Sequence, residues 1–429
     1  MSADPRSIRF YFDYISSNAY LAWTQLAPLA AKYGAVIKPV PVLFAGLLEA
    51  HGQLGPAEVP AKSRWMVINN ARKAMLLGVP LQPPAHHPFN PLLALRVSSL
   101  PMSPAERSIL TTALFEAVWV RGLHVSEPAV VERVATEAGF DGRDCVARAA
   151  LPETKARLRQ QTDDAIARGV FGVPSMEVGS ELFWGYDDFT YLEVVLAGRD
   201  PLAQMAHRGP MPVVTPSAQR RRVQQPSGAP STPRTVEFYF DYGSPWSYLA
   251  STQLAALGDR TGCTVVYRPM LLGGVFKATG NQSPAATPIA AKLRYGSTDL
   301  LRYARLYEVP FHPNPHFPIN TLLLMRVATA AQQAGVFERF HAAIYPAFWA
   351  EGKDLGNPDV IAAVLAAAGL DAPSLLARAG EDAAKSALRA TTDEAVRRGA
   401  FGAPTFFVGD EMFFGNDRLA LVERALRAV

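Results

Sequence analysis

Two serines stand where the chain turns from a strand into a helix, and they are the side chains best placed for chemistry. Ser244 ends a short aromatic segment and precedes Pro245, and Ser16 has the matching place nearer the N-terminus. Serine is favoured just before a helix and proline at its first position, so a purely structural capping role is open. The same geometry suits a hydroxyl that stabilises an anion at the positive end of a helix, and a thiolate is such an anion. Capping therefore does not exclude a site.

The chain offers little thiol or metal chemistry of its own. Cys145 and Cys263 are the only cysteines among 429 residues, and neither belongs to a CxxC motif. No set of cysteines and histidines has zinc spacing, and His312 and His316 flank prolines in a loop. We therefore expect neither dithiol exchange nor a metal site.

A long internal repeat organises the whole sequence. Residues 10–27 and 238–255 are identical at 13 of 18 positions. The match continues downstream at nearly constant offset, through Lys62 and Lys292, Asn90 and Asn320, Arg96 and Arg326, Trp119 and Trp349, and residues 169–174 and 399–404. A period this long is that of a duplicated domain rather than of a solenoid. We predict a first copy over residues 1–205 and a second copy over residues 234–429.

The segment between the copies has a different composition. Residues 206–233 are rich in Pro, Ser, Gln and Arg and contain almost no large apolar side chains. Such a segment buries too little surface to offset its ordering entropy, which predicts a flexible linker. Two tethered copies of one domain favour a two-fold arrangement, so we expect a fused pseudo-dimer.

The same order of elements is expected in each copy. Aromatic and β-branched residues predict a buried strand, followed by a helix and a second strand, which together favour a parallel pair. A long helical stretch comes next, and the copy closes with a hairpin and a final helix. The expected strands are 8–14, 36–42, 174–178 and 182–184 in the first copy, and 236–242, 264–270, 405–408 and 412–414 in the second. This order is that of a thioredoxin-like α/β sheet with a large helical insertion.

Composition and charge narrow the class of protein. Hydrophobic residues make up 49% of the chain, charged residues 19%, and the net charge is +4, which is ordinary for globular domains. Residues 220–222, three consecutive arginines, lie in the predicted linker, so we read them as solvated and expect no nucleic-acid binding. No apolar run approaches the roughly 20 residues that span a bilayer. The first residues do not resemble a secretion signal, so we expect a cytoplasmic protein that does not bind membranes.

Four separated blocks, each matching in order, carry a resemblance to a known family. In the second copy they are 238–250 (FYFDYGSPWSYLA), 273–281, 292–311 and 399–419. With them the chain resembles the 2-hydroxychromene-2-carboxylate isomerases, which are relatives of kappa-class glutathione transferases and of the DsbA-type thioredoxin branch. The resemblance covers both copies. It implies two thioredoxin-like domains with helical insertions, as in the kappa-class and DsbA-like proteins.

The resemblance also implies glutathione as a cofactor and a role for each matching residue. In the second copy, Ser244 would hydrogen-bond the glutathione sulfur, and Asn281 and Lys292 would hold the glycyl end. The backbone of Ala403 would pair with the cysteinyl backbone, and Asn416 and Asp417 would bind the γ-glutamyl ammonium. A purely structural role stays open for each residue. Lys292 would then be a solvated lysine, Asn281 a turn residue, and Asn416–Asp417 a helix cap.

The first copy keeps part of this set. Ser16, Lys62, Val173 and Asp187 match Ser244, Lys292, Ala403 and Asp417. It departs where Ser17, Asn18 and Gln53 replace Pro245, Trp246 and Asn281, and where Tyr186 replaces Asn416. These changes put the affinity and the substrate of the first copy in doubt, so we expect the second site to be closer to the family.

The implied activity is a glutathione-dependent isomerisation. A thiolate favoured by Ser244 would add to an electron-poor carbon of an opened chromene, and rotation followed by elimination would give a benzylidenepyruvate, as in the degradation of aromatic compounds. Two alternatives stay open: a kappa-like transferase or peroxidase, and a thioredoxin-like binding protein without catalysis. Local sequence does not decide whether Pro174 and Pro404 follow cis bonds.

Overall fold

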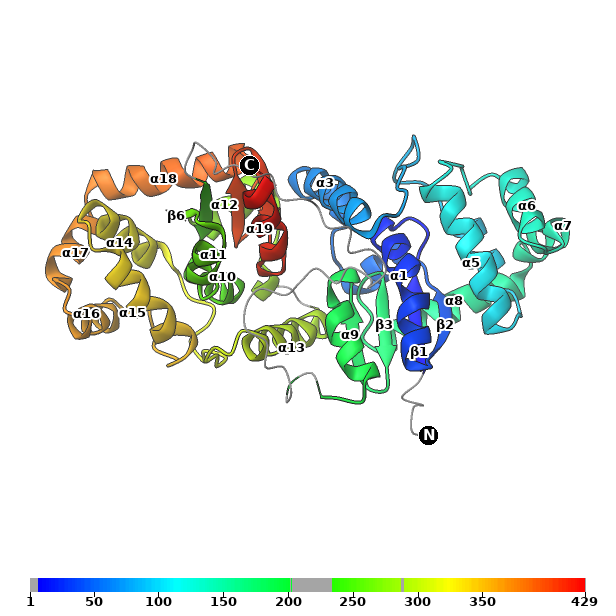
Figure 1. The fold of residues 1–429 in the computed structure, drawn as a ribbon, viewed down its shortest axis with the longest axis horizontal. Coiled ribbons are helices and arrows are strands. Elements are labelled where there is room, and N and C mark those ends of the chain that lie inside the picture. The colour runs from blue at the N-terminus through cyan, green and yellow to red at the C-terminus, as the bar shows by residue number, and fades with distance from the viewer. Residues whose placement is uncertain (1–6, 201, 203–233, 287–288, 429) are drawn as a thin grey trace.

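The computed structural model describes residues 7–200, 202, 234–286 and 289–428 (Figure 1). Within them each copy builds its own four-stranded sheet, with the strand order β2-β1-β3-β4 in the first and β6-β5-β7-β8 in the second. The two halves lie side by side. The predicted linker, 206–233, falls outside the described residues, and the predicted limits of the copies stay a prediction.

The first copy opens with a parallel β-α-β unit and closes with a hairpin and a helix. The strands are β1 (Ser7–Phe12), β2 (Val36–Pro41), β3 (Ser175–Val178) and β4 (Glu181–Trp184). The helices are α1 (Ser17–Tyr33), α2 (Phe44–His51), α3 (Pro60–Leu77), α4 (Leu92–Ser98), α5 (Pro104–Trp119), α6 (Pro128–Glu137), α7 (Gly142–Ala149), α8 (Pro152–Ala167) and α9 (Phe189–Leu196), with short 3₁₀ turns η1 (Pro56–Glu58) and η2 (Tyr186–Asp188). Helices α2 to α8 are the helical insertion that the sequence predicts.

The second copy repeats this order. Its strands are β5 (Thr235–Phe240), β6 (Thr264–Pro269), β7 (Thr405–Val408) and β8 (Glu411–Phe414). Its helices are α10 (Pro245–Ser251), α11 (Leu254–Thr261), α12 (Leu272–Thr279), α13 (Ala290–Leu306), α14 (Leu322–Gln333), α15 (Phe337–Trp349), α16 (Pro358–Ala367), α17 (Ala372–Ala379), α18 (Asp382–Arg397) and α19 (Leu419–Ala428), with 3₁₀ turns η3 (Pro284–Ala286) and η4 (Asn416–Arg418).

Strand pairing follows the expected pattern. β1 pairs with β2 in parallel and with β3 antiparallel, and β5 pairs with β6 and β7 in the same two ways. The prolines of β2 lie on an edge strand, where a missing N–H is tolerated. The hairpins β3–β4 and β7–β8 are confirmed, with Glu181 and Glu411 as their first residues after the turn rather than inside it.

Two local expectations were wrong for identifiable reasons. The first strands stop at Phe12 and Phe240, two residues early, because Asp13 turns the chain by accepting a hydrogen bond from the Ile15 amide at 3.0 Å. The single helix expected after β5 is divided into α10 and α11. The hydroxyls of Ser251 and Thr252 both bond to carbonyls three residues back, which disturbs a helix, and the first copy has Trp23 in place of Ser251.

The copies meet through equivalent surfaces of α3 and α13, which lie at the junction in Figure 1. Arg72 on α3 donates to the carbonyl of Met412 at 2.7 Å and to Glu411 at 2.8 Å. Its counterpart on α13, Arg302, donates to Glu181 at 2.8 Å and is only 1% exposed. An arginine of each copy thus binds the start of the second hairpin strand of the other copy.

Aromatic contacts extend this pairing. Trp65 of α3 packs against Phe401 and Phe414, with ring centroids 5.7 and 5.6 Å apart. The counterpart Tyr295 of α13 packs against Phe171 and Trp184 at 5.3 and 6.2 Å. Because each contact has a partner related by the repeat, the interface is that of a two-fold dimer made within one chain.

Asp13 gives a test of this local structure. Its carboxylate is 1% exposed and also accepts from the Phe44 amide at 2.9 Å, which ties the end of β1 to the start of α2. Burial raises the pKa of Asp13 to about 7. An unfolded aspartate titrates near pH 4, so between about pH 4 and 7 the folded chain holds a proton that the unfolded chain has lost. The stability contributed by Asp13 therefore falls as the pH rises through that window.

We predict that the free energy of unfolding of Asp13→Asn, minus that of the native chain, rises by up to roughly 4 kcal/mol between pH 4 and pH 7. Urea unfolding at several pH values measures this difference. Asp144→Asn, on the exposed surface of α7, is the control. A difference that stays flat across the window would show that Asp13 is ionised throughout.

Candidate functional site

Ser244 lies at the start of α10 and is 3% exposed. Its Oγ accepts a hydrogen bond from the Ser247 amide at 3.1 Å, so the capping role is confirmed. Its hydroxyl hydrogen points to the carbonyl of Ala403 at 3.3 Å, which is long for an O–H donor. That weak bond leaves the hydrogen free to turn to a better acceptor, so the cap also carries an available donor.

The turn before β7 brings the predicted residues together. The bond between Ala403 and Pro404 is cis, and Gly402 lies so close to the Phe414 ring that a Cβ would come within 2.8 Å of it. Asn281 donates from Nδ2 to the carbonyl of Phe401 at 2.8 Å. Ser244 and Asn281 therefore both hold this turn, although they lie 37 positions apart in the sequence.

Lys292 lies in the first turn of α13 and is half-buried. Burial lowers the pKa of its ammonium below the usual value. Among the residues that the structure describes, no carboxylate pairs with Lys292. The alternative of an ordinary solvated lysine does not fit this environment, because a half-buried cation without a carboxylate suits an anionic ligand.

Asn416 and Asp417 follow β8 and face the interface between the copies. The amide of Gly415 donates to the carbonyl of Pro404 at 3.0 Å, which joins this segment to the cis-proline turn. Asn416 is 3% exposed, and its buried Nδ2 has no hydrogen-bond partner in the described part of the chain. The N-cap of η4 is Gly415 rather than either of these residues. The Nδ2 of Asn416 is therefore a buried donor that a ligand could use, and a role for this pair in capping the last helix stays open.

Two neighbours of this segment, Arg418 and Asn69, were missed by the sequence reasoning. Arg418 bonds to Asp417 at 2.8 Å, to Asp187 of the first copy at 2.8 Å, and to Asn69 of the first copy at 3.0 Å. All three nitrogens of its guanidinium are thus engaged. The sequence gives no signal for this network, because nothing in the repeat shows that the two acids approach one arginine.

Asp299 is a further acid near the second serine. Its carboxylate accepts from the indole of Trp246 at 3.3 Å, and Trp246 comes two residues after Ser244. Burial, with the nearby charge of Asp188, raises the pKa of Asp299 well above its usual value. The first copy has the neutral Asn69 at this position. The second copy therefore gathers two acids, Asp299 and Asp417, around one end of its site.

The first copy repeats the geometry around the serine. Ser16 caps α1, and its hydroxyl points to the carbonyl of Val173 at 3.4 Å, next to a cis bond before Pro174. Gln53 donates to the carbonyl of Phe171 at 2.5 Å, as Asn281 does to Phe401. The longer side chain of Gln53 thus makes the same bond to the turn before β3 that Asn281 makes to the turn before β7.

The charged end of the first copy differs sharply. Asp187 pairs with Lys73 at 2.7 Å and with Arg418 at 2.8 Å, and both cations are 6% exposed. Although burial alone would raise it, these two cations hold the pKa of Asp187 well below its usual range. Because the Asp187 carboxylate already pairs with two cations, it attracts a further ammonium group only weakly.

The walls next to the two serines differ as well. Ser17 accepts from the Asn70 side chain at 2.7 Å, and the buried Oδ1 atoms of Asn18 and Asn70 have no partner among the described residues. The second copy has Pro245, Trp246 and Leu300 at these positions. The positions next to the serine are therefore mainly apolar in the second copy and carry hydrogen-bonding side chains in the first.

Lys62 is affected by the second copy too. Burial, with the positive charge of Lys292 across the interface, lowers the pKa of Lys62 to about 8. Near neutral pH this lysine is closer to losing its proton than an ordinary lysine is. The two sites thus lie near enough for their charges to interact.

Comparison with known proteins shows the family to which both copies belong. The family model described as DSBA-like thioredoxin domain matches residues 7–197 and again residues 235–427. The 2-hydroxychromene-2-carboxylate isomerase of Sphingobium xenophagum is 35% identical over 193 residues, which are 45% of this chain and 98% of that protein. The chain belongs to the family of DsbA-like thioredoxin domains.

Other relatives define the branch. The 2-hydroxychromene-2-carboxylate isomerase of Pseudomonas putida is 34% identical and covers 44% of this chain and 93% of its own length. The kappa 1 glutathione S-transferase of Rattus norvegicus is 30% identical over 44% of this chain and 89% of its own length. Each relative corresponds in length to one copy, so this member of an enzyme family is a tandem duplication.

The described residues contain neither a membrane-spanning helix nor a metal-binding cluster. No helix there has the length and apolar character needed to cross a membrane. No cluster of three or more His, Cys, Asp or Glu side chains suited to a metal ion occurs there either.

The Arg418 network gives a prediction about stability. Asp187→Asn leaves Lys73 and Arg418 buried with one carboxylate fewer, so we expect a loss of about 3 kcal/mol in the free energy of unfolding. Asp417→Asn is the matched control, since Arg418 then keeps Asp187 and the cost is about 1 kcal/mol. Urea unfolding measures both. Equal losses in the two variants would contradict the difference in partners, since Asp187 pairs with two buried cations and Asp417 with one.

Proposed function

We propose that the chain is a glutathione-dependent isomerase of the 2-hydroxychromene-2-carboxylate type, and that its second copy carries the reaction. The observation that carries the proposal is the Ser244 hydroxyl, buried and weakly held beside the Ala403–Pro404 turn. Relatives named 2-hydroxychromene-2-carboxylate isomerase, at 34–35% identity, support the reaction type. The glutathione S-transferases among the relatives support the cofactor.

The residues of the second copy fit glutathione in charge and in hydrogen bonding. Lys292 would take the glycyl carboxylate, next to Asn281, because it is a half-buried cation without a carboxylate. The backbone of Ala403 would pair with the cysteinyl residue. The unpartnered Nδ2 of Asn416 and the carboxylate of Asp417 would bind the γ-glutamyl group at its carboxylate and its ammonium. Each end of the peptide then meets the opposite charge.

Bound glutathione supplies a thiol whose ionised form adds reversibly to a conjugated carbon, so that the bond beside it can rotate. A free thiol has a pKa near 8.5, and a hydrogen-bond donor to the sulfur lowers it. Ser244 would be that donor when its hydrogen turns from the Ala403 carbonyl to the sulfur. This effect comes from the Ser244 hydroxyl and does not depend on the helix α10, which is only seven residues long.

The rest of the second copy would hold an aromatic substrate. Trp246 stands two residues from Ser244, its indole fixed by the bond to Asp299, and the side chain is apolar enough to pack on a planar ring. Trp349, in contrast, is 2% exposed and donates to the Tyr242 carbonyl at 2.9 Å, so it belongs to the core. We propose a small aromatic compound as the substrate.

The first copy would not bind glutathione in the same way. An ammonium arriving at Asp187 would meet two cations, Lys73 and Arg418, whereas Asp417 pairs with Arg418 alone. We therefore propose one glutathione site per chain, at Ser244, and an internal pseudo-dimer in which the first copy supports the second.

Ser244→Ala and Ser16→Ala test this assignment as a matched pair. Conversion of a chromene carboxylate, followed by ultraviolet absorption with glutathione present, should slow about 100-fold in Ser244→Ala, as when one donor to a developing charge is removed. Ser16→Ala should retain its rate within about two-fold. Equal slowing in the two variants would contradict a single active copy.

Calorimetric titration with glutathione gives the stoichiometry. We expect about one molecule per chain, bound by Ser16→Ala and by the native chain alike. No binding at millimolar glutathione would overturn the proposal. Binding with conjugation of an electrophile, but without chromene isomerisation, would assign the kappa-like transferase activity instead.

A further inference from the structure

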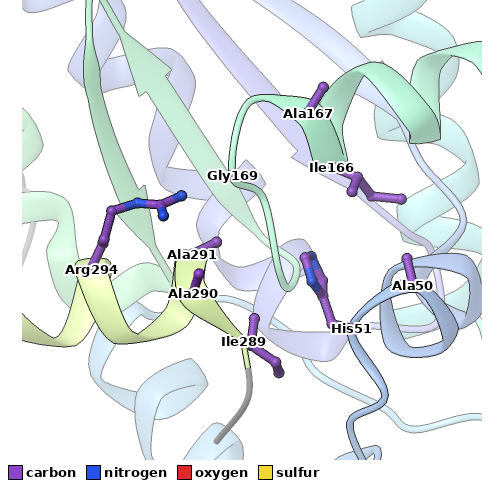
Figure 2. Close-up of a pocket in the computed structure, with 9 residues that line it drawn as sticks. All are labelled: Ala50, His51, Ile166, Ala167, Gly169, Ile289, Ala290, Ala291 and Arg294. Atoms are coloured by element: carbon purple, nitrogen blue, oxygen red, sulfur yellow. The ribbon is translucent and has the colours of Figure 1, made fainter.

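A cavity lies between the two copies. It has a volume of about 420 Å³, within the range of roughly 300–1,000 Å³ that is common for small-molecule sites. The first copy contributes the end of α2 and the end of α8, and the second copy contributes the start of α13 (Figure 2). Its lining residues are Ala50, His51, Ile166, Ala167, Gly169, Ile289, Ala290, Ala291 and Arg294. None of these belongs to either serine site.

The lining residues are mostly small or aliphatic and include no acid. Seven of the nine residues are alanine, isoleucine or glycine, and no carboxylate is among them. The polar members are Arg294 and His51, one from each copy. Arg294 has no ion-pair partner in the described part of the chain. Arg294 is exposed at the mouth of an open cavity whose lining residues include no acid. Such a cation suits an organic anion, and a guanidinium binds a carboxylate with two parallel hydrogen bonds.

The orientation of His51 strengthens this reading. Its Nε2 lies 3.2 Å from the carbonyl of Val170. Because a carbonyl only accepts, this nitrogen carries the hydrogen, and the ring is fixed against the turn that follows α8. The imidazole ring lines the same cavity as Ile166 and Ile289 and offers a flat face on which an aromatic ring can pack.

The repeat makes the cavity specific to one side of the interface. At the equivalent places in the other half, Thr279 replaces His51 and Arg397 replaces Ala167, while Arg64 matches Arg294. The other side thus has no imidazole and carries a long cationic side chain where this side has a methyl group. The equivalent region is not the same kind of site, and one ligand per chain is expected.

We propose that this cavity binds a small aromatic carboxylate, with the carboxylate on Arg294 and the ring between His51 and the isoleucines. The proposal does not rest on the function of the serine sites. Both copies must be in place, since Arg294 and His51 come from different halves. The cavity is therefore a binding site created by the fused pair.

Titration of the full chain with 1-naphthoate tests the proposal. We expect saturable binding of about one molecule per chain, at least ten-fold weaker in Arg294→Met. Ala167→Glu, which puts a carboxylate on the rim, should weaken binding by a similar factor. Arg64→Met, the equivalent arginine on the other side, is the matched control and should bind like the native chain. The neutral analogue 1-naphthalenemethanol should bind weakly to all of them.

The opposite results are equally defined. The proposal fails if the native chain does not bind 1-naphthoate at millimolar concentration, or if Arg294→Met and Ala167→Glu bind it as the native chain does while their thermal midpoints are unchanged. It also fails if Ser244→Ala abolishes 1-naphthoate binding, since the anion would then occupy the serine site. Failure of glutathione to bind would leave the 1-naphthoate result intact, so the two proposals are separately decided.

Discussion

The antiparallel pairing of the first strand of each copy with the strand after its cis proline is the constraint on which the rest depends. In the second copy Phe238 pairs with Phe406 and Tyr239 with Thr405, so the end of β5 reaches the turn before β7. The serine that follows β5 is thereby brought within hydrogen-bonding distance of a carbonyl 159 residues away. The helical insertion fills the sequence between them and supplies Asn281 and Lys292. A site with a buried hydroxyl and a half-buried cation follows from that register.

Much of this arrangement could be predicted from the sequence, because it depends on local chemistry or on the repeat. Ser-Pro after an aromatic strand predicted the cap, and the two matching halves predicted one fold twice. Asn281, which the resemblance assigned to the glycyl end of glutathione, donates a hydrogen bond to the turn before β7. The assignments of ligand roles remain predictions until glutathione binding is measured.

What could not be predicted depends on surfaces that meet only in three dimensions. Arg418 and Asp187 are far apart in sequence, and neither residue type shows that one will be buried against the other. A signal did exist for the arginine contacts, since Arg72 and Arg302, and likewise Glu181 and Glu411, occupy equivalent positions in the repeat. The division between α10 and α11 escaped because it depends on two neighbouring hydroxyls bonding back to the helix, which helical periodicity does not reveal.

Fusion changes what substitutions such a pair can tolerate. In a homodimer every substitution appears twice, so an aspartate in place of Arg418 would remove both arginines at once and set acids against acids on both sides. Here Asp188 holds the equivalent position in one copy only, where it bonds to Tyr295 and lies 3.9 Å from Arg302. Joining the halves in one chain thus lets a residue change in one half without the same change in the other, so the two halves can acquire different contacts.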